Sequence, residues 1–400
     1  MKNTGSPENT RILNRLLTLN YLRNHSTSSR TEIAQKIGLS KMTVSSIVNE
    51  LINENYVIEI GEGKSMQNGG RKPIILSLNG KDHYVLGVDI GLTKIVVGIG
   101  NLKGQILFSA HDTTKDKKLD SIILQTKGIV NDLLANKDYD DILCVSISIG
   151  GIIDSNKGII SFSPDFGWRD VNFKENLEEI LQLPVVINNC TRMMAIAEQY
   201  NEKSKKYKSF LYINIGHGIG SAIVIDGKIY DNHSEFGHIP ITDKRIKCDC
   251  GKMGCLECVS SGNAIEKEAN IVFGNENSLI SAKRLAEMAI KGDENAKKIF
   301  NNAGKSLGKG IAIAANLLNV DAVIIGGGVA QAKDLFIDSM MEEFNKHTID
   351  VIKESTEIEF SSLGMESALI GSISFALNRF IFDTLDSRPL MTSMEALLQA

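Results

Sequence analysis

The sequence has 400 residues, 42% of them hydrophobic and 23% charged, and its formal net charge at pH 7 is −4. This length predicts two or three domains, and the composition is that of a globular protein. No apolar run reaches the roughly 18 residues that span a bilayer, and the N-terminal segment lacks the apolar region of a signal peptide. We therefore expect a cytoplasmic protein with no membrane partner.

Charge is distributed unevenly along the chain. Residues 1–80 carry ten basic and six acidic side chains, whereas the rest of the chain carries 34 basic and 42 acidic ones. A basic segment attached to an acidic body is typical of a nucleic-acid-binding head, although chance also produces a surplus of this size.

Three helices are predicted in the basic segment. The first covers residues 8–27, where apolar residues recur at helical spacing. Ser29 and Glu32 form a capping box that opens a second helix, which ends before Gly38. Ser40 caps a third helix, whose apolar side chains have the spacing that faces a core: Val44, Ile47, Val48, Leu51 and Ile52. Two short helices joined by a glycine turn predict a helix-turn-helix.

The other face of the third helix is small, polar and free of carboxylates, which suits entry into the major groove of DNA. Residues 56–78 then predict two strands around a polar, glycine-rich tip, as in a wing. The residues expected to contact DNA are Ser40, Lys41, Thr43, Ser45, Ser46, Arg71 and Lys72. We therefore predict a winged helix-turn-helix over residues 1–80 that binds a double-stranded DNA operator. The alternative is a three-helix interaction module without DNA affinity.

The remaining chain predicts two related α/β halves. The segments "HYVLGVDIGLTKIVVGIGNLKGQIL" and "KSFLYINIGHGIGSAIVIDGKIY" both read as strand, glycine-rich turn and strand, which indicates an internal duplication. Two such halves form a cleft, and glycine turns facing it can hold phosphate through backbone N–H groups, although any hairpin can use glycine. The helices predicted between the strands cover residues 117–136, 190–202, 260–272, 278–291, 294–318 and 331–346.

Four of the six cysteines fall between positions 248 and 258, a clustering that favours a metal site over disulfides. His238, Cys248, Cys250 and Cys255 supply one imidazole and three thiolates, the ligand set of a closed, structural zinc site. Gly251 and Gly254 permit the tight turns that this spacing requires. The alternative is a loop without metal. Cys258 is expected to be a bystander.

Several motifs together resemble the ROK family of repressors, open reading frames and sugar kinases. They are "DIGLTK", "GGIID", "SPDFGW", "EFGHIPI", "CDCGKMGCLEC", "NLLNVDAVIIGGGV" and "ESALIGS". The resemblance implies an actin/hexokinase-like (ribonuclease H-type) body of two α/β lobes behind the winged helix-turn-helix. We expect the N-terminal lobe over 81–190, the C-terminal lobe with the zinc loop over 191–384, and a tail over 385–400.

The resemblance also implies a sugar site at Asn188, Asn189, Glu235, His238 and Glu257. Amides and carboxylates suit this role because they exchange hydrogen bonds with sugar hydroxyls. The alternative for either glutamate is a solvated or ion-paired carboxylate. ROK kinases carry their catalytic aspartate at the position of Asn189, and an amide cannot accept the proton that this base removes.

Other departures from the kinase pattern point the same way. Leu92 stands where the first phosphate loop usually has a second glycine, and the second loop carries His217, Ser221 and Ala222. Asp165 stands where asparagine is usual. We therefore expect no catalytic residues and no kinase activity.

The sequence thus predicts a sugar-responsive transcriptional repressor that resembles the xylose-type repressors. It would bind a palindromic operator as a homodimer or higher homo-oligomer. Two alternatives stay open at this point: an ATP-dependent sugar kinase with a DNA-binding head, and a regulator that responds to a protein partner instead of a sugar.

Overall fold

The computed structural model describes residues 7–63, 72–135, 141–230, 234–243, 245–274 and 279–382. Contacts divide the chain into two units: one runs to Asn189 and resumes at Ser372, and the other is Cys190–Gly371. This grouping places residues 372–382 with the first unit. These residues lie inside the range 191–384 that was predicted as the C-terminal lobe. The lobe limits stay a prediction, and the predicted tail at 385–400 lies outside the described residues.

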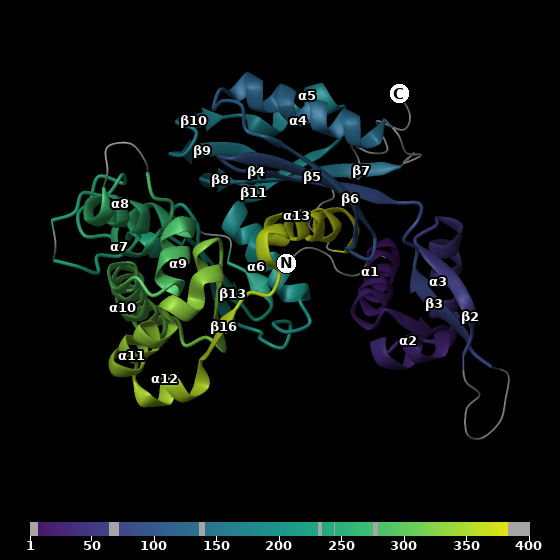
Figure 1. Cartoon of the computed structure of the whole chain (residues 1–400). Helices are drawn as coiled ribbons and strands as arrows, with labels where there is room; N and C mark the ends of the chain where they lie inside the picture. Colours follow the sequence, from purple (N-terminus) through teal and green to yellow (C-terminus); the bar gives the residue numbers. More distant parts are fainter. Residues whose placement is uncertain are drawn as a thin grey trace. The chain divides into compact units, whose positions relative to one another are not determined.

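The head of the first unit has three helices and a small sheet, coloured purple to dark blue in Figure 1. Its elements are α1 Pro7–His25, β1 Thr27–Ser29, α2 Arg30–Ile37, α3 Lys41–Asn53, β2 Val57–Glu62 and β3 Ile74–Leu78. The sheet order is β1-β3-β2, and β2 and β3 form the antiparallel wing. The predicted winged helix-turn-helix is therefore confirmed.

Local chemistry sets the helix ends in the head. The hydroxyl of Ser29 accepts a hydrogen bond from the Glu32 N–H at 3.3 Å, and Gly38 ends α2 with φ 72°, a left-handed conformation that glycine adopts without strain. Helix α1 ends earlier than predicted because Ser26 also adopts a positive φ, after which the chain forms β1. Of the α3 residues predicted to face the core, Val44, Ile47, Val48 and Leu51 are buried and Ile52 is partly buried.

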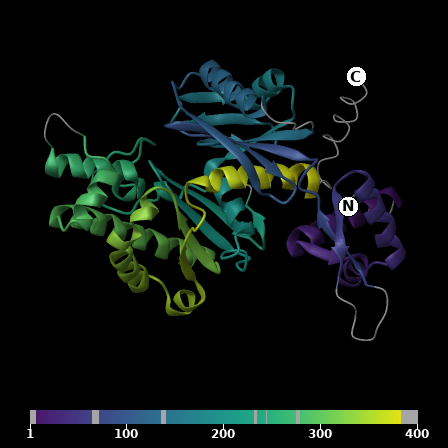
Figure 2. The same cartoon turned by 45° about the vertical axis from the view of Figure 1, so that its right-hand side comes forward.

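The rest of the first unit is built on a five-stranded sheet of order β11-β7-β4-β5-β6. Its strands are β4 Tyr84–Ile90, β5 Lys94–Asn101, β6 Ile106–Thr113, β7 Ile142–Ile149 and β11 Val185–Asn189. Helices α4 (Leu119–Leu134) and α5 (Phe173–Leu181) cover one face, and the part of α13 that starts at Ser372 covers the other (Figures 1 and 2). A three-stranded sheet of β8 (Ile152–Asp154), β9 (Ile159–Ser163) and β10 (Trp168–Val171) lies between β7 and α5 in the chain.

The second unit repeats this topology with the sheet order β14-β13-β12-β15-β16. Its strands are β12 Phe210–Ile215, β13 Ile219–Ile225, β14 Lys228–Ile229, β15 Ala322–Gly326 and β16 Glu357–Phe360. In both sheets the first strand pairs antiparallel with the second and parallel with the fourth, which confirms the predicted duplication. The first helix, α6 (Cys190–Tyr200), packs on β12 and β13.

The other helices of the second unit form a separate layer, coloured green in Figure 1. They are α7 Glu257–Ser260, α8 Gly262–Phe273, α9 Ala282–Ile290, α10 Glu294–Leu318, α11 Ile337–His347 and α12 Asp350–Ser355, and α13 (Ser367–Leu377) follows β16. The long α10 has the predicted bounds. The helix predicted over 331–346 is wrong in its first third, because Val329–Leu335 is a 3-10 segment interrupted at Ala332 and α11 begins only after it.

Several short helices were not predicted, among them α5, α7 and α12. Each is 4 to 9 residues long and shows too few apolar repeats to stand out in a sequence window. Within the described ranges, no helix combines the length and the apolar character needed to cross a membrane.

Candidate functional site

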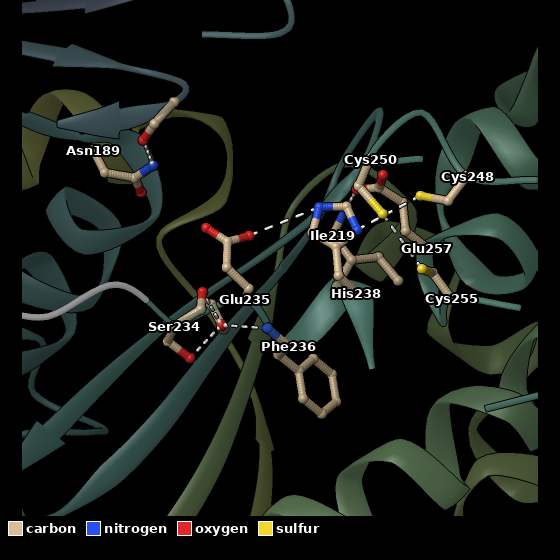
Figure 3. A network of polar contacts seen from close by, with 12 residues as sticks. Asn189, Ile219, Ser234, Glu235, Phe236, His238, Cys248, Cys250, Cys255 and Glu257 are labelled. Atoms are coloured by element: carbon tan, nitrogen blue, oxygen red, sulfur yellow. Dashed lines mark hydrogen bonds and ion pairs between the residues drawn. The ribbon is translucent and has the colours of Figure 1, made fainter. Parts of the chain in front are cut away.

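The predicted metal ligands come together in the second unit. His238 ends a short 3-10 helix (Phe236–His238), and the three cysteines lie in the loop that follows. The ligand atoms of His238, Cys248, Cys250 and Cys255 all lie within 4.8 Å of one another. Figure 3 shows these four side chains pointing toward one another. Sequence reasoning therefore found a cluster that can hold a metal ion.

Two of the distances between ligand atoms match those of a tetrahedral zinc ion. Two thiolates bound to zinc at its usual Zn–S distance stand about 3.8 Å apart, and a thiolate and an imidazole nitrogen stand about 3.6 Å apart. The sulfurs of Cys250 and Cys255 are 3.7 Å apart, and Nδ1 of His238 is 3.6 Å from the sulfur of Cys248. The donor set and these two distances thus suit a four-ligand site.

Backbone hydrogen bonds support the loop around the cluster. The N–H of Gly254 donates to the Ile246 carbonyl at 2.9 Å, and the N–H of Cys248 donates to the Lys252 carbonyl at 2.8 Å. Gly251 and Gly254 have φ values of 87° and 72°, which confirms that glycine is needed at both turns. Cys248 and Cys255 are buried, and burial raises the pKa of the Cys255 thiol to about 12 when no ion is bound.

Two predicted sugar ligands lie beside this cluster. The carboxylate of Glu235 is 3.7 Å from Nε2 of His238, on the side of the ring opposite the nitrogen that faces Cys248 (Figure 3). This separation is longer than a hydrogen bond, so Glu235 is a neighbour of the outer nitrogen of the ring and not a hydrogen-bond partner. Glu257 begins α7, and its Oε2 accepts a hydrogen bond from the N–H of Ile219 at 2.8 Å. Glu257 thus ties the cysteine loop to the start of β13.

The other two predicted sugar ligands end strand β11 in the first unit. Asn188 is buried, and its Oδ1 accepts from the N–H of Asn189 at 2.9 Å. The side-chain Nδ2 of Asn189 donates to the carbonyl of Gly151 at 2.8 Å. The amide group at position 189 therefore makes a hydrogen bond that an ionised aspartate cannot make.

Two of the positions that depart from the kinase pattern, Leu92 and Ser221, have structural roles. Leu92 packs against the hydrophobic core of the first unit. The Ser221 hydroxyl donates to the Ser234 carbonyl at 2.9 Å, and His217 is exposed. A β-carbon on Gly327 would stand 2.5 Å from the carbonyl oxygen of Ile215, and the residue has a φ of 94°, so packing and backbone conformation both require glycine here.

Sequence reasoning gave no role to the carboxylate of Asp89 at the end of β4. The Ser148 hydroxyl donates to it at 2.7 Å. Loss of hydration raises the pKa of Asp89, while the bond from Ser148 acts in the opposite direction. The signal in the sequence was a carboxylate at the end of an apolar strand.

The predicted DNA-contacting residues cluster at the start of α3 and on the wing. The Ser40 hydroxyl accepts the Thr43 N–H at 3.0 Å, so this side chain serves as a helix cap. Lys41 and Ser46 are exposed, while Thr43 and Ser45 are partly buried. Lys72 is exposed and lies 3.7 Å from a carboxylate oxygen of Glu62. Arg71 lies outside the described residues.

A histidine that the sequence did not single out joins the head to the sheet of the first unit. Nε2 of His83 donates to the carbonyl of Glu54, the C-cap of α3, at 2.8 Å, and Nδ1 lies against the carboxylate of Asp141. The ring stacks on Tyr56 with centroids 4.3 Å apart. The Glu54 side chain in turn pairs with Arg15 of α1. These contacts fix the end of α3 that lies farthest from its predicted DNA-binding start.

Comparisons with known proteins agree with this architecture. Residues 85–379 match the ROK family, and residues 13–58 match a winged helix-turn-helix DNA-binding family. The xylose repressor of Bacillus spizizenii is 29% identical over 379 residues, which cover 92% of this chain and 96% of that protein. The glucokinase of Halalkalibacterium halodurans is 29% identical over 311 residues, which cover 72% of this chain and 94% of that protein.

A solved structure matches the fold over nearly the whole chain. The crystal structure of a ROK family transcriptional regulator, a homolog of the E. coli MLC protein, has a TM-score of 0.81 at 24% identity and covers 92% of this chain and 96% of that chain. Because the ROK match spans well over half of the sequence, this chain belongs to the ROK family, with a winged helix-turn-helix ahead of an actin/hexokinase-like body.

Proposed function

We propose that the protein is a sugar-responsive, DNA-binding repressor of carbohydrate-use genes. The observation that carries this proposal is a winged helix-turn-helix joined to a ROK body. The amide of Asn189, at the position where the resemblance to ROK kinases implies a catalytic aspartate, supports it. The xylose repressor of Bacillus spizizenii resembles the chain over nearly its full length, whereas the glucokinase of Halalkalibacterium halodurans covers a smaller share of it.

The proposed sugar ligands are Asn188, Asn189, Glu235, His238 and Glu257. Their amide and carboxylate groups can accept from and donate to hydroxyls, and each is held by a rigid element or by the cysteine loop. A sugar that binds two conformations of the body unequally shifts the equilibrium between DNA-competent and incompetent states. A coupling free energy of about 1–3 kcal/mol gives a useful response.

The proposed metal is zinc, held by His238, Cys248, Cys250 and Cys255. Three thiolates and one imidazole at tetrahedral spacing form a closed site, and bound zinc supplies structural stability there. Glu235 lies beside the outer nitrogen of the imidazole, and the glycine turns shape the loop that carries the thiolates. The loop would thereby present Glu235 and Glu257 to a ligand.

We further propose that the protein has no kinase activity. Asn189 cannot accept a proton from an attacking hydroxyl, and loss of a general base costs about 10²–10⁴ in rate. The similarity to a glucokinase favours the alternative, a sugar kinase with a DNA-binding head. A palindromic operator, a homodimer and a cytoplasmic location complete the proposal, since a symmetric site matches a two-fold protein.

A thermal-shift screen of the full chain against pentoses, hexoses, N-acetyl sugars and their phosphates, with and without ATP–Mg²⁺, tests the proposal. A ligand that binds only the native state raises the melting temperature. We expect a shift with one sugar class and none with ATP–Mg²⁺. A shift with ATP–Mg²⁺ together with ADP release in the presence of sugar would support the kinase instead. No shift with any sugar would indicate a protein partner as the signal.

A further inference from the structure

Helix α3 of the head carries an exposed apolar side chain where the sequence pattern called for polar ones. Met42, the second residue of the helix, is 81% exposed. All the buried residues of α3 lie on the other side, where Val44, Ile47 and Val48 form part of the head core. Met42 is therefore not needed to fold the head.

The position of Met42 identifies the surface it belongs to. It shares a helix face with Ser46 and Asn49, at the i, i+4, i+7 spacing, and both of these are also exposed. The first turn of α3 contains no acidic residue and includes the exposed Lys41. A cationic, carboxylate-free helix start is complementary to the phosphate backbone of DNA, which is the occupant we choose for this face.

The chemistry of the side chain limits what it can recognise. A thioether has no hydrogen to donate and accepts only weakly, so it cannot read the donor and acceptor pattern of base edges. The C5-methyl group of thymine is the apolar feature that the major groove offers. A flexible, polarisable side chain such as methionine can pack against that methyl group from a helix whose exact approach is set by phosphate contacts.

We propose that Met42 is a specificity-determining residue that reads the C5-methyl group of a thymine in each operator half-site. This inference rests on the proposed function, because it requires that α3 enters the major groove. It differs from the polar contacts expected at Lys41 and Ser46, which position the helix and exchange hydrogen bonds.

The test uses the full chain and an operator selected from random DNA by the wild-type protein. Each thymine of the operator is replaced singly by deoxyuridine, which removes only the methyl group, and affinities are measured by fluorescence anisotropy at one salt concentration. We expect one thymine per half-site at which the replacement weakens wild-type binding about fourfold, the effect of one buried methyl group. At that position Met42→Ala should bind thymine and uracil equally, and Met42→Leu should keep the discrimination.

Leu13→Ala is the matched control, because Leu13 is an apolar residue 42% exposed on α1 and should leave the uracil profile unchanged. The proposal is overturned if Met42→Ala keeps the wild-type profile, if no thymine is sensitive, or if the substitution alters only the oligomeric state. In those cases operator binding itself persists and the proposed function stands. Failure of the wild-type protein to select any DNA would overturn both.

Discussion

Replacing Asn189 by aspartate restores the carboxylate expected of a ROK kinase, and the structure predicts a less stable protein that gains no activity. In the native protein Nδ2 of Asn189 donates to the Gly151 carbonyl at 2.8 Å. An ionised aspartate places an acceptor oxygen against that carbonyl, so a bond is lost and two oxygens face each other. Leaving a polar group such as the Gly151 carbonyl without its hydrogen bond costs about 1–3 kcal/mol of stability. Because Asn189 and Gly151 are both partly exposed, we expect a value in the lower half of that range.

The sign of the pH dependence provides an internal control. A protonated carboxyl can still donate to the Gly151 carbonyl, so folding favours protonation and raises the carboxyl pKa of Asn189→Asp above its usual value near 4. The destabilisation should therefore be small at pH 4 and should grow as pH rises to 8. A penalty of 1–2 kcal/mol corresponds to a drop of about 2–8 °C in melting temperature for a unit of this size.

Thermal denaturation of Asn189→Asp and the wild type across this pH range measures the effect, and ADP release with ATP–Mg²⁺ and a sugar panel measures activity. Equal melting temperatures at pH 8 would refute the hydrogen-bond argument. Sugar-dependent ADP release by the variant would refute the account of the phosphate loops, in which Leu92 belongs to the hydrophobic core.

Four further predictions test other parts of the structure. Asp89→Asn removes a carboxyl whose pKa in the folded protein is raised above 3.8. The wild type therefore loses stability as pH rises through that pKa, whereas the variant does not. In urea titrations the variant should be the more stable protein, by a margin that grows from pH 4.5 to 7.5. Glu257→Gln keeps an acceptor for the backbone N–H of Ile219, whereas Glu257→Ala leaves that N–H unpaired. In the same assay the alanine variant should lose about 1–3 kcal/mol more free energy of unfolding than the glutamine variant. Cys255→Ser should abolish stoichiometric zinc, measured by native mass spectrometry, while Cys258→Ser retains it; equal zinc in both would contradict the ligand assignment. His83→Ala removes two hydrogen bonds and a ring stack at the end of the head. We expect faster amide hydrogen exchange in residues 79–83 of this variant. Unchanged exchange would count against the contacts described for His83.

Features encoded by neighbouring residues were predictable from the sequence. The caps at Ser29 and Ser40, the turn at Gly38 and the bounds of α10 follow from local hydrogen bonding and helical periodicity. The metal cluster was also predictable, because three of its four ligands fall within eight positions and the chemistry of the set is distinctive.

Contacts between distant parts of the chain were not predictable in the same way. The histidine at position 83 meets a helix end 29 residues earlier and a carboxylate 58 residues later. The bond from Ser148 to Asp89 depends on strand pairing, and the donor to Gly151 comes from a side chain 38 residues away. A single sequence carries no signal for such pairings, so these roles became visible only in the folded chain.

The central claim is that a sugar changes the affinity of this protein for DNA. The most direct test is a titration of the full chain onto its selected operator, followed by fluorescence anisotropy, with and without each sugar that shifts its melting temperature. We predict that one sugar changes the Kd for the operator by about 5- to 150-fold, the range of ordinary coupling free energies, and leaves binding to unrelated DNA unchanged. An operator Kd that is the same with and without every sugar that binds would contradict the account.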